Sequence, residues 1–310
     1  MYFVTFIYLY TQYKTMKRKI VQHGSSSLTV TLPVKWVKKF NMKKGDELEV
    51  VESGPVLTVT TGSEISMPKK RVSTTESGIF TKNNLSHLYQ LGYDEIEISF
   101  DDPKTLDEIK QRLPDCIGFE IIDQKPNKVL IKSIATTLET EFDTLLRKAF
   151  MIANEMAKDM IGAFEKESYG KLKEIRSMES LNNKFTDVCI RILNKKGYKA
   201  PKRTMQVYEI VKNIERIADE FKYICDLNKK ISSEELRSFK QAVEYYLAFY
   251  EMFYKFDAKL KKKLYDERNS LVKIFSEQIE KSKNPLFLHH CINIVMKAFD
   301  GAGGYFALVL

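Results

Sequence analysis

Apolar residues recur every three or four positions throughout the last part of the chain, from about Thr137 to the C-terminus. One stripe covers residues 142–164, and a second covers residues 172–192. An α-helix turns once every 3.6 residues, so this spacing gathers the apolar side chains on one face of each helix. The apolar faces must be buried against one another, which predicts a helical bundle over residues 137–310.

Turn formers divide this region into six helices in two sets of three. Ser232 with Glu235 three residues later forms a capping box that begins the fourth helix, which is rich in aromatic residues, and Pro285 follows a capping Asn at the start of the sixth. Residues 214–219 and 295–300 are similar to each other and fall on the last helix of each set. The sequence therefore predicts a bundle of two three-helix repeats.

The middle of the chain, residues 78–135, mixes the two kinds of periodicity. A short helix ends at Gly92, a strand follows at residues 96–100, and a second helix covers residues 105–113. Two strands follow at residues 119–122 and 129–131. This predicts a small α/β unit, and its residues form no recognisable chemical motif.

The first part of the chain, residues 16–65, alternates apolar and polar residues as half-buried strands do. Leu28, Val30 and Leu32 alternate with threonines, and Pro33 opens a short helix before the next strands. A fold of roughly 50 residues with so few apolar side chains has a marginal core. We therefore expect a second copy of this module to complete it. The whole chain is predicted to be a multidomain α+β protein.

Positive charge is concentrated in this N-terminal module. The chain has a net charge of +9, and residues 16–71 hold eleven Lys and Arg against five Asp and Glu. Lysines, arginines and small hydroxyl residues in one place favour binding to a phosphate backbone. The candidate DNA-binding residues are Lys17, Arg18, Lys19, Ser25, Ser26, Ser27, Lys35, Lys38, Lys39 and Lys43.

The cysteines and the first residues bear on localisation. The four cysteines are far apart and lie on apolar stretches, which indicates free thiols in a reducing cytoplasm. The apolar run at the N-terminus is too short to span a bilayer. Residues 1–15 are predicted to be a non-structural leader, with the protein proper beginning at Met16, and the protein is not expected to be embedded in a membrane. A membrane-surface anchor at residues 1–15 is the alternative.

The N-terminal module resembles the swapped-hairpin AbrB/MazE/SpoVT family. The resemblance is carried by residues 19–22, 27–37 and 43–50, about 45 residues in all. It implies an intertwined homodimer that grips double-stranded DNA through basic residues of the first strand and the short helix. Carried over to this sequence, these are Lys19 and the pair Lys38 and Lys39.

The helical region resembles PhoU, the phosphate-uptake regulator family. The similarity lies in residues 185–192 and in residues 213–219, which carry the E-R-x-x-D signature. In that family such carboxylates bind iron or other divalent or trivalent metal ions. The resemblance therefore implies metal ligands at Asp187, Glu215 and Asp219. The second repeat retains Asp300 alone.

Two interpretations of these carboxylates remain open. Glu215 and Asp219 are four residues apart and share a helix face, so both can reach one cation. On a helical wheel they flank the apolar stripe, and Asp187 points away from its own, so a metal would lie on the bundle surface. The alternative is an acidic surface paired with neighbouring lysines and arginines. Asn183 stands where a further acidic residue is expected.

We expect a non-enzymatic, DNA-binding regulator of phosphate uptake that senses phosphate status through its PhoU-like bundle. A component of a phosphate ABC transporter is a possible partner. The alternative is an adaptor that restrains such a transporter without binding DNA and uses the N-terminal module for dimerisation. A metal-dependent hydrolase is disfavoured because the carboxylates lack a pocket base. An antitoxin is disfavoured because antitoxins of this kind carry a short disordered tail.

Overall fold

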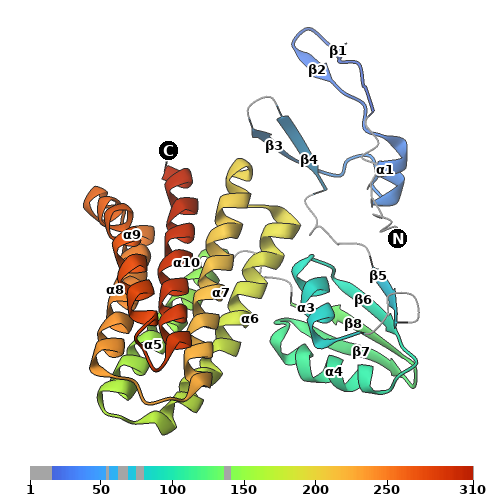
Figure 1. Ribbon diagram of the computed structural model, residues 1–310. Coiled ribbons are helices and arrows are strands. Elements are labelled where there is room, and N and C mark those ends of the chain that lie inside the picture. Colours follow the sequence, from blue (N-terminus) through green and yellow to red (C-terminus); the bar gives the residue numbers. More distant parts are fainter. Residues whose placement is uncertain (1–15, 54–55, 62–68, 75–79, 136–140, 310) are drawn as a thin grey trace, which may run out of the picture. The chain divides into compact units, whose positions relative to one another are not determined.

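A computed structural model gives the fold of the chain (Figure 1) and describes residues 16–53, 56–61, 69–74, 80–135 and 141–309. The chain separates into two compact units, residues 1–64 and residues 65–310. The predicted leader, residues 1–15, lies outside the described residues, as do residues 137–140 at the start of the predicted bundle. Each unit is described by itself.

The N-terminal unit consists of two hairpins joined by a helix. Strands β1 (Val21–His23) and β2 (Ser27–Thr29) pair antiparallel, with Val21 opposite Thr29. Helix α1 (Val34–Lys39) follows, and then the antiparallel pair β3 (Glu49–Ser53) and β4 (Val56–Thr60). The strand predicted through Leu32 is shorter than expected, because β1 pairs with β2 only as far as Thr29.

The described residues of this unit form no buried interior. None of its described residues for which burial is given is buried. Ile20, Leu28, Val30, Val50 and Leu57 are each more than half exposed, although Leu28 and Val30 belong to the alternating pattern. A single copy therefore leaves uncovered the side chains that should form its core.

The second unit begins with a four-stranded sheet. Its strand order is β5-β6-β8-β7, with β5 parallel to β6 and the other neighbours antiparallel. Helices α3 and α4 lie against one face of this sheet (Figure 1). The strand residues Ile96, Ile98, Val129 and Ile131 are fully buried. The elements are β5 (Lys70–Ser73), α3 (Lys82–Gln90), β6 (Glu95–Ser99), α4 (Lys104–Arg112), β7 (Phe119–Lys125) and β8 (Lys128–Ser133).

Strand β5 was not predicted from the sequence, whereas the other five elements of this α/β part were. Of its four residues only Val72 is apolar, so no alternation marks it. It forms because the edge of β6 is free to accept a parallel partner after the crossover through α3. The predicted end of α3 is confirmed, since Gly92 has a φ of +91° and takes the left-handed conformation that ends a helix.

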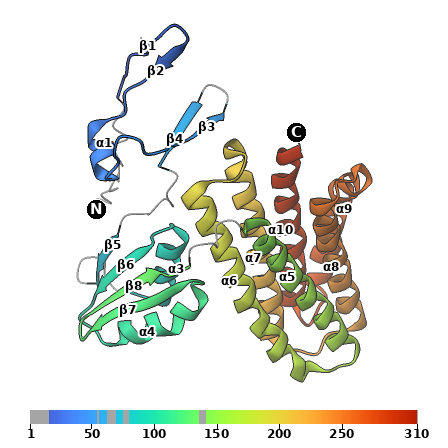
Figure 2. The same cartoon turned by 180° about the vertical axis from the view of Figure 1, so that it is seen from behind.

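Six long helices complete the unit and confirm the predicted bundle (Figures 1 and 2). Helix α5 packs along α6, α6 along α7, and α7 along α10, while α8, α9 and α10 pack together. Their bounds are α5 (Phe142–Glu165), α6 (Leu172–Lys196), α7 (Thr204–Leu227), α8 (Ser233–Tyr254), α9 (Ala258–Ile279) and α10 (Pro285–Val309).

The capping box predicted from the sequence is present at the start of α8. The amide of Glu235 donates to Ser232 Oγ at 3.2 Å, and the amide of Ser232 donates to Glu235 Oε2 at 2.7 Å, which makes the capping box reciprocal. The aromatic residues of α8 pack against the bundle except for Tyr254, which is 45% exposed, and Phe239 and Phe249 are fully buried. All four cysteines are free and buried, as predicted. Across the described residues, no helix is both long and apolar enough to cross a membrane.

Candidate functional site

The basic residues of the N-terminal unit are all exposed. Lys17, Arg18 and Lys19 lie just before β1, and the three serines form the β1–β2 turn and the start of β2. Ser27 Oγ donates to the carbonyl of His23 across this turn. The turn needs Gly24, which has a φ of +72°. This hairpin therefore presents both positive charge and hydroxyl groups to solvent.

Helix α1 carries three more of the predicted lysines. Lys35, Lys38 and Lys39 are exposed, while Trp36 and Val37 on the same helix are half-buried. Lys38 and Lys39 occupy the last turn, where the helix dipole favours positive charge. Lys43 lies exposed in the following turn, where its amide donates to Asp46 Oδ2 at 2.7 Å.

These cations are not compensated by any acidic residue that the structure describes. Among the described residues, none of the seven predicted lysine and arginine side chains forms an ion pair, and Lys39 alone makes a ring contact, with Phe40. An uncompensated group of cations on a small module is what a phosphate backbone requires. The geometry is consistent with DNA binding, which stays a prediction.

The carboxylates predicted as metal ligands lie on neighbouring helices. Asp187 belongs to α6, and Glu215 and Asp219 belong to α7. The surface position expected for Asp187 is wrong, because only 4% of the residue is exposed. The α/β part of the unit covers this side of α6 and buries the carboxylate. Asp300 is exposed on α10.

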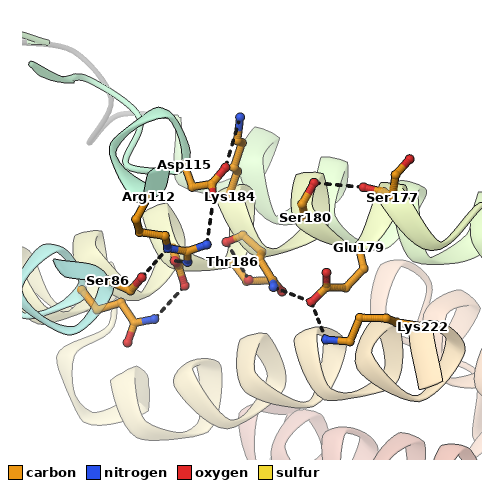
Figure 3. A network of polar contacts seen from close by, with 12 residues as sticks. Ser86, Arg112, Asp115, Ser177, Glu179, Ser180, Lys184, Thr186 and Lys222 are labelled. Carbon is orange, nitrogen blue, oxygen red and sulfur yellow. Dashed lines mark hydrogen bonds and ion pairs between the residues drawn. The ribbon is translucent and has the colours of Figure 1, made fainter. Parts of the chain in front are cut away.

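Two groups from the α/β part hold the Asp187 carboxylate. Arg112 Nη2 donates to Asp187 Oδ2 at 2.9 Å, and Gln90 Nε2 donates to Oδ1 at 2.6 Å. Arg112 is itself held by Asp115 at 2.8 Å and by the hydroxyl of Ser86 (Figure 3). Burial raises the pKa of Asp187 to about 6, against the opposing effects of Gln90 and Arg112.

The other carboxylates are paired with lysines. Glu215 pairs with Lys212, and Asp219 pairs with Lys222. Lys222 also reaches Glu179 on α6 at 2.8 Å (Figure 3). Each acid on this face therefore has a cation beside it, as the alternative interpretation expected.

This donor set does not fit a metal ion. A metal would have to displace two lysines and an arginine, and ammonium and guanidinium groups are not ligands. Asn183 supplies one buried amide oxygen without a hydrogen-bond partner, which is not a ligand set. Within the described residues, no three His, Cys, Asp or Glu side chains are grouped to hold a metal. The predicted ligands, Asp300 included, are thus not brought together as a centre.

Sequence reasoning missed the residues that contact this face from the α/β part, chiefly Gln90, Asp94 and Arg112. A signal was available on α6, where Asp187, Arg191 and Lys195 are spaced four apart. Polar residues at that spacing form a stripe of their own beside the apolar one. A second polar stripe on a helix predicts a second packing partner.

The chain thus consists of a basic module of two hairpins, an α/β part and a helical bundle. Residues 21–70 match the family model described as antidote-toxin recognition MazE, bacterial antitoxin, and residues 146–227 match that of the PhoU domain. The first match includes all four strands of the N-terminal unit, and the second covers α6, α7 and most of α5.

These matches confirm both resemblances found in the sequence. Both families are regulatory rather than enzymatic. No curated protein and no solved structure matches the chain.

Proposed function

We propose that this protein is a DNA-binding regulator of phosphate uptake that acts by binding rather than by catalysis. The observation that carries the proposal is the group of cations on the N-terminal unit that form no ion pair with any described residue, in contrast to the compensated charges around α6 and α7. The MazE-type match supports DNA binding, and the PhoU match supports a link to phosphate status.

The active form in this proposal is a homodimer. The apolar side chains that the N-terminal unit leaves exposed, such as Leu28 at 71% and Ile20 at 66%, would be buried by a second copy. Two copies would also double the number of cations along the DNA. A regulator with two identical modules reads two half-sites, which gives it both affinity and register.

The bundle would receive the phosphate signal, through a phosphate-transporter component as partner. No metal centre enters this proposal, because the carboxylates are compensated by protein cations.

The test is DNA binding by the full chain, measured by fluorescence anisotropy at low and physiological salt. Duplexes from phosphate-transport promoters are compared with unrelated duplexes of equal length. We expect preferential binding that survives physiological salt. A plot of log affinity against log salt concentration has a negative slope. The Lys38→Ala/Lys39→Ala variant should make this slope less steep by about 0.9 for each DNA phosphate that the protein no longer neutralises.

The matched control is Lys262→Ala/Lys263→Ala, which removes two adjacent exposed lysines from helix α9 of the bundle. It lowers the net charge equally and should leave the salt slope unchanged. Binding that is absent, or indiscriminate and lost at physiological salt, would favour the adaptor that restrains a transporter. Equal effects of the two variants would show that net charge alone drives binding.

A further inference from the structure

Helix α6 presents a stripe of polar side chains to the α/β part of its unit. Asp187, Arg191, Asn194 and Lys195 follow one another at intervals of four, three and one, so they share one face. All four contact the α/β part. Asn194 Nδ2 donates to the carbonyl of Gln90 at 2.8 Å, and Lys195 Nζ lies 2.9 Å from Asp94 Oδ1.

Arg191 is the centre of this contact. Its Nη1 donates to the carbonyl oxygens of Tyr89 at 3.0 Å and of Tyr93 at 2.9 Å. The carbonyl of Tyr89 belongs to the last turn of α3, where backbone acceptors lack intrahelical donors and the helix dipole is negative. The guanidinium also lies over the rings of Tyr89 and Phe119, at 5.0 and 4.7 Å.

The residue Gly92, just after α3, allows the side chain of Lys195 to come close to the backbone. A Cβ at Gly92 would lie 2.6 Å from Cγ of Lys195, so no larger residue fits without moving that side chain. The φ of +91° at Gly92 also disfavours any other residue. The two parts therefore meet through backbone as well as side chains.

The ion pairs across this contact are reciprocal. Arg112 of the α/β part pairs with Asp187 of the bundle, and Arg191 of the bundle pairs with Asp94 of the α/β part. Both arginines are well covered, with 18% and 7% of their side chains exposed. Reciprocal pairs fix the register of the contact, because a shift along α6 separates both pairs at once.

We propose that the α/β part docks on the α6 face that carries Asp187, and that Arg112 occupies the position of a metal ion there. Metal binding at Asp187 and docking of the α/β part then exclude each other. The central α/β part acquires a role, which is to cover Asp187 and neutralise its carboxylate. The proposal does not depend on DNA binding.

The first test is hydrogen exchange of the full chain, followed by mass spectrometry. Arg112→Ala and Arg191→Ala should each speed exchange at residues 82–92 by about tenfold or more, while the buried strand β6 keeps its protection. Arg112→Lys keeps the charge and should restore part of the protection. The matched control, Arg176→Ala, removes an exposed arginine–aspartate pair from the same helix and should leave residues 82–92 unchanged.

The second test is metal uptake by the full chain, with Mn²⁺ and with Fe³⁺ supplied as citrate, measured by elemental analysis after dialysis. The wild-type chain should retain less than a stoichiometric amount of either ion, and Asp187→Asn should match it. The proposal is overturned if the wild type binds an ion that Asp187→Asn loses. It is equally overturned if neither arginine variant changes exchange at residues 82–92.

Discussion

The two charged regions of this protein treat their charges in opposite ways. On the N-terminal unit, seven lysine and arginine side chains are exposed, and within the described residues none is ion-paired. On the α6–α7 face, the carboxylates of Asp187, Glu215 and Asp219 each have a cation beside them. A compensated charge contributes to the fold, whereas an uncompensated one is available to a partner. This difference points to the N-terminal unit as the binding surface.

The difference between compensated and uncompensated charges can be tested by substitution. The largest loss of stability is expected from Arg191→Ala. Only 7% of the Arg191 side chain is exposed, and its removal takes one hydrogen bond from Asp94, which keeps Lys195, and one from each of two carbonyl oxygens. The free energy of unfolding should fall by about 3 kcal/mol, because three hydrogen bonds from a charged donor are lost. Urea unfolding of the full chain, followed by circular dichroism, measures it.

The control is Arg176→Ala on the same helix. Arg176 and Asp226 form an equivalent pair, but their side chains are 47% and 44% exposed. Solvent screens such a pair, so we expect a loss of about 0.5 kcal/mol. Similar losses in the two variants would break the distinction between a structural and a solvent-facing charge.

The next effect concerns the apolar side chains of the N-terminal unit. Leu28→Asp should weaken the proposed homodimer by about 100-fold in dissociation constant, which corresponds to roughly 2.7 kcal/mol, because it places a carboxylate in the buried contact. Sedimentation velocity over a range of concentrations measures the change. Leu286→Asp replaces a leucine that is 57% exposed on α10 and should leave the mass unchanged. A wild-type chain that sediments as a monomer would contradict the homodimer itself.

The sequence predicted the six helices of the bundle because their signal is local. Each helix spans about six turns, and its apolar stripe repeats often enough to be recognised without knowing its neighbours. Strand β5 gave no such signal. It has four residues and depends on pairing with β6 for its formation, and β6 begins more than twenty residues later in the chain.

The candidate sites show the same limit. The candidate residues Lys38 and Lys39 are exposed on α1, whereas Trp36 and Val37 beside them are half-buried. Asp187 was placed correctly off the apolar stripe of α6, but its burial was missed. A helical wheel shows what a helix buries against its bundle and cannot show a second partner that covers the opposite side. That partner, the α/β part, recognises α6 through Arg112 and Gln90, which lie about 75 and 97 residues earlier.

The smallest expected effect is a change in the pKa of Glu97, a residue of the four-stranded sheet. It tests whether a paired charge there depends on specific partners. Lys69 and Lys128 hold the pKa of Glu97 at about 2, through ion pairs of 2.6 and 2.9 Å. A lowered carboxyl pKa stabilises the fold above the usual value of 4.5, and this contribution is lost as the pH falls through about 2. Lys128→Met should raise the pKa of Glu97 by about one unit, measured by carboxyl ¹³C NMR.

Lys125→Met is the matched control for that measurement, since Lys125 faces Lys128 across the β7–β8 pair and has no ion pair among the described residues. It should leave the pKa of Glu97 unchanged. If both variants raise it equally, the low pKa reflects the general positive potential of the sheet face rather than specific partners. The positive potential around Glu97 would then be diffuse, like the potential expected around the N-terminal lysines. The distinction between paired and unpaired charges would not hold for this sheet.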